Sequence, residues 1–113
     1  MDSTIAVSAL NALAHAHRLA TFRLLVQAGP EGLTAGTIAA QVGITPSSMS
    51  FHIKDLVRAD LIQARHVGRQ IFYSARFETM NGLVAYLTEN CCGGNPCSPV
   101  STTASAKEGS ACS

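Results

Sequence analysis

The chain has 113 residues, a formal net charge of +1 at pH 7 and 47% hydrophobic residues. This length suits a single domain with one core, and no uninterrupted apolar run of about 18 residues is present to span a membrane. The N-terminus also lacks a basic stretch followed by a compact apolar run, so we expect neither a signal peptide nor a membrane partner. We expect a cytoplasmic protein whose four cysteines stay reduced.

The positive charge is concentrated in one segment. Between residues 45 and 76, five basic residues stand against two acidic ones, a local balance of +3, and the rest of the chain sums to −2. The basic residues are Lys54, Arg58, Arg65, Arg69 and Arg76. A cationic segment in a nearly neutral chain favours DNA as a partner. A solvated helix face would give the same pattern, so charge alone does not decide.

Helical periodicity predicts two N-terminal helices. The first would be capped by Ser3 or Thr4, and its apolar positions are Ile5, Ala9, Leu10 and Leu13. The second would run over residues 16–27, and the apolar residues on one side of it are Leu19, Phe22, Leu25 and Val26. Gly29-Pro30 would end this helix.

Two shorter helices are predicted next. Thr34 would cap the third helix and Gly43 would end it; the residues facing inward are Ile38, Ala39 and Val42. Thr45 would cap the fourth helix, with Pro46 in its first position, where the missing N–H costs nothing. The residues of its buried stripe are Met49, Ile53, Leu56 and Val57, and Leu61 anchors its exit.

The period then changes. Residues 62–66 and 70–74 are β-branched and aromatic runs around Val67-Gly68-Arg69, which predicts a β-hairpin. Helical spacing returns over residues 77–89, where the apolar positions are Phe77, Met80, Leu83, Val84 and Leu87. Beyond Cys97 the composition is too polar and too small to form a core. We therefore expect a domain over residues 1–90 and a tail over residues 91–113, disordered except where a thiol is held.

Two short helices joined by residues 43–45 and followed by a hairpin predict a winged helix-turn-helix, a mainly α fold with a β-hairpin wing (α+β). In this arrangement the second of the two helices presents its N-terminal end to the major groove of DNA. The small hydroxyl side chains at that end are Thr45, Ser47, Ser48 and Ser50, which would reach phosphates or base edges. Helix capping alone would explain one or two of them. The basic residues placed to assist are Lys54 on the helix and Arg65 and Arg69 on the hairpin.

Residues 47–56, Ala59-Asp60-Leu61-Ile62 and Gly68-Arg69 before Tyr73 resemble the ArsR-type winged-helix metalloregulators. Those proteins carry a Ser-x-His-Leu-x-x-Leu reading helix, a Gly-Leu-Val exit and a Gly-Arg wing tip before a Tyr, and the resemblance covers about residues 8–90. It implies that Ser47, Ser48, Ser50 and His52 lie on a DNA-reading helix and Arg69 on the wing. It also implies a homodimer on double-stranded operator DNA, paired through its first and last helices. The interface residues would be Ile5, Leu10, Leu13, Met80, Leu83, Val84 and Leu87.

Three cysteines lie within seven residues, at Cys91, Cys92 and Cys97. Gly93-Gly94 and Asn95-Pro96 favour a turn that would bring Cys97 back to the other two. Three thiolates form a soft site that suits a thiophilic ion and suits magnesium or calcium poorly. A thiol enzyme would instead need a cysteine at a helix N-terminus, whereas these follow a helix C-terminus. No other catalytic motif is present, so we expect no enzyme activity.

The Cys-Val-Cys site of familiar ArsR-type arsenic sensors has no counterpart in residues 33–41, and residues 77–90 lack the His and Asp ligands of the zinc sensors. The cluster resembles instead the subgroup with a C-terminal Cys-Cys…Cys arsenite site, which implies As(III) or Sb(III) as inducer and no organic cofactor. Cys112 as a fourth thiolate would favour zinc or cadmium. A redox-responsive repressor and a metal-trafficking protein are further alternatives. His15 and His17 form another candidate metal pair, although a polar helix start explains them more simply.

Overall fold

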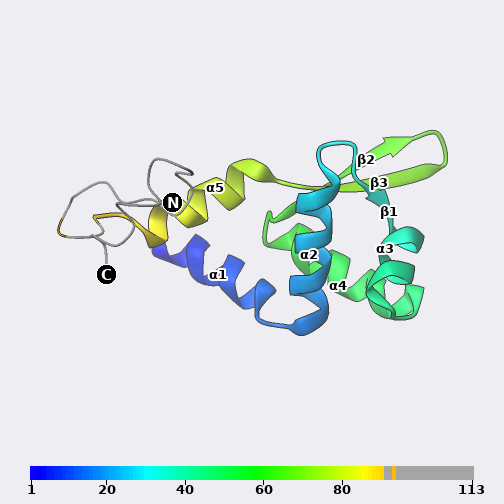
Figure 1. Cartoon of the computed structure of the whole chain (residues 1–113), viewed down its shortest axis with the longest axis horizontal. Coiled ribbons are helices and arrows are strands. Elements are labelled where there is room, and N and C mark those ends of the chain that lie inside the picture. The colour runs from blue at the N-terminus through cyan, green and yellow to red at the C-terminus, as the bar shows by residue number, and fades with distance from the viewer. Residues whose placement is uncertain (91–92, 94–113) are drawn as a thin grey trace, which may run out of the picture.

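The computed structural model describes residues 1–90 and Gly93. These residues form five α-helices and a three-stranded sheet (Figure 1). The elements are α1 (Ser3–Leu13), α2 (Ala16–Ala28), β1 (Leu33–Thr34), α3 (Ala35–Val42), α4 (Pro46–Arg58), β2 (Ile62–Val67), β3 (Gln70–Ala75) and α5 (Phe77–Leu87). This order confirms the expected winged helix-turn-helix fold. The expected tail, apart from Gly93, lies outside the described residues, so the division at residue 90 stays a prediction.

The helix ends of the helix-turn-helix follow local chemistry. Thr34 caps α3, because its Oγ1 accepts a hydrogen bond from the Thr37 N–H at 3.3 Å. Gly43 ends α3 in the left-handed conformation, with φ of 87°. Thr45 caps α4 in the same way as Thr34 caps α3, with Pro46 at the first helical position. These ends confirm the sequence prediction.

The start of α1 differs from the prediction. Asp2, rather than Ser3 or Thr4, caps this helix, and its Oδ1 accepts a hydrogen bond from the Ile5 N–H at 2.9 Å. A carboxylate beside the helix N-terminus also interacts favourably with the helix dipole. Within residues 1–90, no helix is long and apolar enough to cross a membrane.

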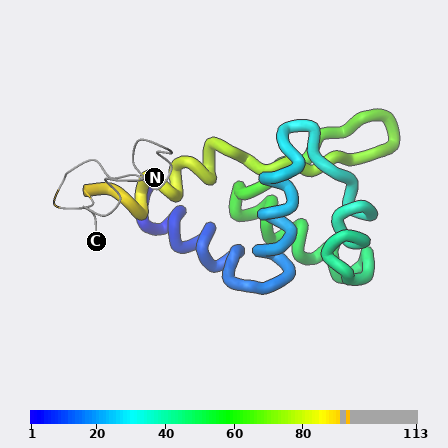
Figure 2. The backbone as a smooth tube through the Cα atoms, in the orientation of Figure 1, coloured from blue at the N-terminus to red at the C-terminus, as the bar shows by residue number. Residues whose placement is uncertain are grey.

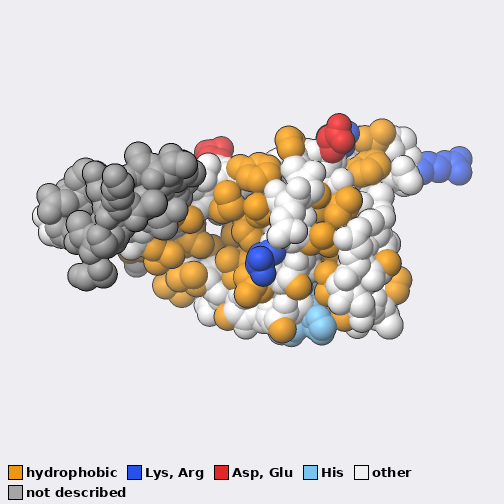
Figure 3. Space-filling view, in the orientation of Figure 1, with side chains coloured by type: hydrophobic (Ala, Val, Ile, Leu, Met, Phe, Trp, Pro, Cys, Tyr) orange, Lys and Arg blue, Asp and Glu red, His pale blue; other side chains and the backbone are white. Residues whose placement is uncertain are grey.

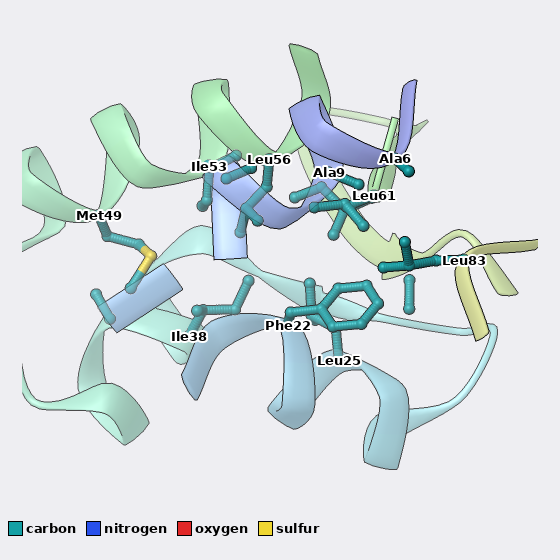
Figure 4. Close-up of a cluster of buried hydrophobic side chains, with 14 residues drawn as sticks. Ala6, Ala9, Phe22, Leu25, Ile38, Met49, Ile53, Leu56, Leu61 and Leu83 are labelled. Atoms are coloured by element: carbon teal, nitrogen blue, oxygen red, sulfur yellow. The ribbon is translucent and has the colours of Figure 1, made fainter. Parts of the chain in front are cut away.

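The core lies where α2, α3 and α4 meet, and Figure 4 shows Met49, Ile53 and Leu56 of α4 pointing into it. The largest fully buried side chains are Leu25, Ile38, Met49, Leu56, Leu61, Ile62 and Thr21. The predicted buried stripe of α4 is correct except at Val57, which is 39% exposed. Val57 faces a groove beside the hairpin and does not reach the helical core.

Helix α1 packs through its smallest residues. Ala6, Ala9 and Ala12 are buried, whereas Ile5 and Leu10 are 50% and 42% exposed. Alanine side chains let α1 approach α2 and α4 closely, and the larger apolar side chains remain on the outer surface. The alanine face of α1 therefore contributes to the hydrophobic core.

The sheet has the strand order β1-β3-β2, and all pairs are antiparallel. The hairpin was expected from the sequence, and its two-residue tip is Gly68-Arg69, with Gly68 at φ of 62°. The third strand is not predicted by the sequence, which indicates only a helix start at Thr34; in the structure Leu33 pairs with Tyr73 and Thr34 with Phe72. Strand β1 thus ties the wing to the start of α3.

The approach to β1 requires glycine at position 32. Gly32 has φ of +77°, and a Cβ there would collide with the carbonyl oxygen of Tyr73. We predict that Gly32→Ala lowers the free energy of unfolding by about 2 kcal/mol or more. Gly36→Ala is the matched control, because a Cβ at Gly36 meets nothing within 4 Å and alanine favours a helix by up to about 1 kcal/mol. Urea unfolding of both variants measures the difference; equal stabilities would contradict the close approach.

Candidate nucleic-acid interface

The N-terminal end of α4 carries a set of exposed hydroxyl groups. Thr45, Ser47, Ser48 and Ser50 are all exposed. The Thr45 hydroxyl donates to Ser48 Oγ at 3.0 Å, and the Ser50 hydroxyl donates to the Pro46 carbonyl at 3.1 Å. Ser48 accepts in its bond, so its own O–H can be donated to a phosphate oxygen. Capping therefore orients these hydroxyls while leaving them on the surface.

Helix α3 holds α4 in position. Ile38 and Ala39 are buried against the core, and the backbone N–H of Gly43 donates to the Ala39 carbonyl at 2.8 Å before the chain turns into α4. The two helices pack against each other. This arrangement presents the hydroxyl-bearing end of α4 outward, as the helix-turn-helix prediction requires. Contact of these side chains with DNA stays a prediction.

The outward face of α4 also carries a residue that the sequence interpretation missed. Phe51 is 68% exposed, and Lys54 Nζ lies 6.0 Å from the centroid of its ring. The signal was present in the helical period, since Phe51 falls about 200° from Met49 at 3.6 residues per turn.

The two arginines of the hairpin differ in their surroundings. Arg65 donates from Nη2 to the Glu31 carbonyl at 2.9 Å and lies over the Phe72 ring at 5.3 Å. Arg69 is exposed at the hairpin tip. Figure 3 shows a basic side chain projecting beyond the end of the hairpin. Arg65 therefore fastens the wing to the loop before β1, whereas Arg69 is the better placed of the two to meet a DNA strand.

A groove of about 530 Å³ separates α4 from the wing. Its lining residues are Ile53, Lys54, Val57, Arg58, Ala64, His66, Ile71 and Tyr73. The floor is apolar, and Lys54, Arg58 and His66 supply basic groups. One of these, Arg58, is paired with Asp55 at 3.5 Å. The groove is therefore an apolar hollow between α4 and the wing, with the basic side chains of Lys54, Arg58 and His66 in its lining.

A cluster of three histidines lies between α4 and the start of α2. The ring centroid of His52 on α4 is 4.6 Å from that of His15 and 5.8 Å from that of His17. His15 caps α2, because its Nδ1 accepts a hydrogen bond from the His17 N–H at 3.2 Å. The helix-start interpretation is thereby confirmed for His15. Among the described residues, no group of three His, Cys, Asp or Glu side chains is arranged to hold a metal ion.

The surroundings of His52 favour its neutral form. Burial lowers the pKa of His52, and the nearby His15, Arg18 and His17 lower it further, while Asp55 raises it. Arg18 and Asp55 form an ion pair at 3.3 Å across α2 and α4. The resemblance implies that His52 lies on the DNA-reading helix; it is partly exposed there and packs against the start of α2, and its contact with DNA stays a prediction.

The residues assigned to a dimer interface fall into two groups. Ile5, Leu10 and Leu87 are between 42% and 59% exposed, and Leu13, Met80 and Val84 are partly buried. Leu83 is only 7% exposed and belongs to the core of the single chain, so its burial needs no partner. Val7, at 56% exposure, extends the apolar surface and was missed. Figures 1 and 2 show α1 and α5 side by side at one end of the molecule.

The arrangement of these elements is shared with known regulators. A family model described as a helix-turn-helix domain matches residues 13–63. The nodulation protein NolR of Rhizobium meliloti is 28% identical over 88 residues, which are 78% of this chain and 70% of that protein. The HTH-type transcriptional regulator YgaV of Escherichia coli (strain K12) is 29% identical over 87 residues, 77% of this chain and 86% of that protein.

Several solved structures of transcriptional regulators are also similar to this chain in fold. NolR from Sinorhizobium fredii superimposes with a TM-score of 0.63 at 28% identity, covering 82% of this chain and 89% of that one. An ArsR-like transcriptional regulator from Rhodococcus sp. RHA1 gives a TM-score of 0.66 at 23% identity, covering 77% and 78%. The homodimeric winged helix-turn-helix DNA-binding domain Mb0332 of Mycobacterium bovis gives 0.62 at 23% identity, covering 77% and 81%.

The chain has a winged helix-turn-helix fold and is similar to DNA-binding transcriptional regulators, in agreement with the expectation of no enzyme activity. The regulators to which it is similar include NolR and YgaV.

The neutral state of His52 leads to a pH dependence. Because the pKa of His52 is lowered from its ordinary value of 6.5, the unfolded chain binds the proton more readily than the folded one. The stability that depends on neutral His52 is therefore present above pH 6.5 and is lost as the pH falls through the lowered pKa. We predict that His52→Gln flattens the decline in thermal stability between about pH 7 and pH 5.

The matched control is His66→Gln, since His66 lies on the exposed hairpin, away from the cluster. This variant should keep the wild-type pH profile. If His52→Gln and wild type lost stability in parallel over this range, the neutral form of His52 would not contribute to the stability of the fold.

Proposed function

We propose that this protein is a transcriptional repressor that responds to As(III) or Sb(III). As a homodimer it binds operator DNA through α4 and the wing, and it leaves the DNA when a metalloid binds Cys91, Cys92 and Cys97. The observation that supports DNA binding most directly is the exposed surface of hydroxyl and basic side chains on α4. Helix α3 packs against α4, and Arg69 adds an exposed basic side chain at the wing tip.

The metalloid part of the proposal is supported by the sequence. All three cysteines lie outside the described residues, as does Cys112. The last helix ends at Leu87 with Thr88 as its C-cap, so the cysteines follow this helix after only a few residues. As(III) and Sb(III) bind three thiolates in a pyramid and have a lone pair where a fourth ligand would stand. Three clustered soft ligands therefore suit them, whereas tetrahedral zinc and cadmium take four.

The homodimer is supported by the surface over α1 and α5. Ile5, Val7, Leu10 and Leu87 are exposed apolar side chains on these two neighbouring helices. A similar domain, Mb0332, is described as homodimeric. A two-fold axis would bury these side chains and would set two α4 helices about 34–36 Å apart, to match successive major grooves.

The response to the ion would follow from this geometry. A ligand site at the end of α5 adjoins the dimer surface, and α1 contacts both α5 and α4. A change at the end of α5 would therefore alter the spacing of the two reading helices. Such coupling is typically worth about 1–3 kcal/mol, or roughly a 5- to 150-fold change in DNA affinity.

The cysteine assignment is tested by fluorescence anisotropy on a duplex selected from a random library. We expect arsenite to weaken wild-type binding by roughly 5- to 150-fold. Cys91→Ser, Cys92→Ser and Cys97→Ser should each bind DNA normally and ignore arsenite, because each leaves only two of the three thiolates. Cys112→Ser is the matched control and should respond like wild type.

Three results would contradict the assignment. If arsenite fully released the Cys97→Ser variant from DNA, the three-thiolate site would be ruled out. Release by zinc or cadmium that requires Cys112 would favour a four-thiolate metal site. Release by the thiol oxidant diamide, with no response to arsenite, would favour a redox-responsive repressor.

The dimer assignment is tested by sedimentation at micromolar concentration. Leu87 is 59% exposed in the single chain, so Leu87→Glu should leave the fold intact but place two unpaired carboxylates at the seam. We expect this variant to sediment as a monomer and the wild type as a dimer. Val67→Glu, at a 45% exposed position on the wing, is the matched control and should stay dimeric. A monomeric wild type would end the dimer model.

A further inference from the structure

Phe51 is the most exposed large hydrophobic side chain in the described residues, at 68%. A phenylalanine ring carries a large apolar surface, and leaving it in water forgoes the gain from burying it. Exposed apolar surface of this kind is informative when it lies at a binding face. Phe51 is informative because of its position, on the face of α4 that also carries the exposed Ser47 and Lys54.

The position of Phe51 on α4 identifies the surface that would cover it. Met49 and Ile53 point into the core in Figure 4, and Phe51 lies midway between them in sequence. At 3.6 residues per turn, its side chain leaves the helix about 200° from Met49. Ser47 lies one turn before it and Lys54 one turn after it, both exposed on the same outward face. Phe51 is thus at the middle of the reading face.

The chemistry of the ring restricts what it can recognise. Phenylalanine has no hydrogen-bond donor or acceptor, so it cannot bind phosphate oxygens or the polar edges of bases. The apolar group that base pairs present in the major groove is the C5-methyl of thymine. Lys54, whose Nζ lies 6.0 Å from the ring centroid, supplies the charge for a neighbouring phosphate.

We propose that Phe51 is a specificity-determining residue whose ring contacts the C5-methyl group of one thymine in each operator half-site. The inference rests on the proposed DNA-binding function and adds a base preference to it. The contact selects T·A over C·G at that position without a hydrogen bond. It also explains why the reading face carries an aromatic residue between Ser50 and His52.

Deoxyuridine tests this contact because it differs from thymidine only by the methyl group. In the selected duplex, each thymine is replaced in turn, and the affinity of the full-length wild-type protein is measured by anisotropy. At one symmetry-related pair of positions, removing a methyl should lower the affinity about fourfold, and removing both should lower it about 15-fold. Other thymines in the site should show no such effect.

The Phe51→Ala variant completes a double-mutant cycle between the protein and the DNA. Phe51→Ala should bind the thymine duplex more weakly and should no longer distinguish thymine from uracil at that pair, because the ring that sensed the methyl is gone. Circular dichroism should show an unchanged fold, since the ring is exposed. Arg69→Ala is the control: it should bind more weakly but keep the full sensitivity to uracil, because a wing contact to phosphate is independent of the methyl.

The possible failures are distinguishable. If wild type binds DNA with no thymine-to-uracil effect at any position, or if Phe51→Ala retains the wild-type effect, the inference is wrong while the proposed function stands. If the wild type shows no sequence-selective DNA binding, the proposed function fails and the inference fails with it.

Discussion

The seating of α4 is the constraint on which the rest of the structure depends. Met49, Ile53 and Leu56 fill one narrow stripe of this helix and lock it against α2 and α3. Met49 is fully buried, with the Thr21 hydroxyl 3.6 Å from its sulfur. Because the stripe fixes the rotation of α4 about its own axis, it also fixes which residues face outward. The hydroxyls, Phe51 and Lys54 occupy the reading face only because the opposite side is anchored.

A second set of contacts holds α4 from its flank. The Arg18–Asp55 ion pair and the packing of His52 against His15 join α4 to the start of α2. Helix α1, which leads into that junction, also lies against α5. The reading helix therefore shares a rigid neighbour with the helix that precedes the cysteines. Under the proposed function, α1 is the element through which a change at the end of α5 would reach α4.

Much of the fold could be predicted because its signals are local. Thr34, Gly43 and Thr45 mark helix ends by chemistry within a few residues, and the hairpin follows from the alternating runs around Gly68. What the sequence could not reveal depends on residues far apart in the chain. Strand β1 exists because Leu33 meets Tyr73, and Val57 is exposed because it lines the groove beside the wing. Proximity of His52 to His15 arises only when α2 and α4 pack together.

Under the proposed function, α4 and the wing contact DNA at the same time. The salt dependence of DNA binding tests this most directly. Each phosphate contact contributes about 0.9 to the slope of the logarithm of the binding constant against the logarithm of salt concentration. A dimer that loses Arg69 from both wings by the Arg69→Ala substitution should therefore show a slope smaller in magnitude by about 1.8, with weaker binding at every salt concentration. An unchanged slope and affinity would contradict the account, because the exposed wing tip would then lie away from the DNA.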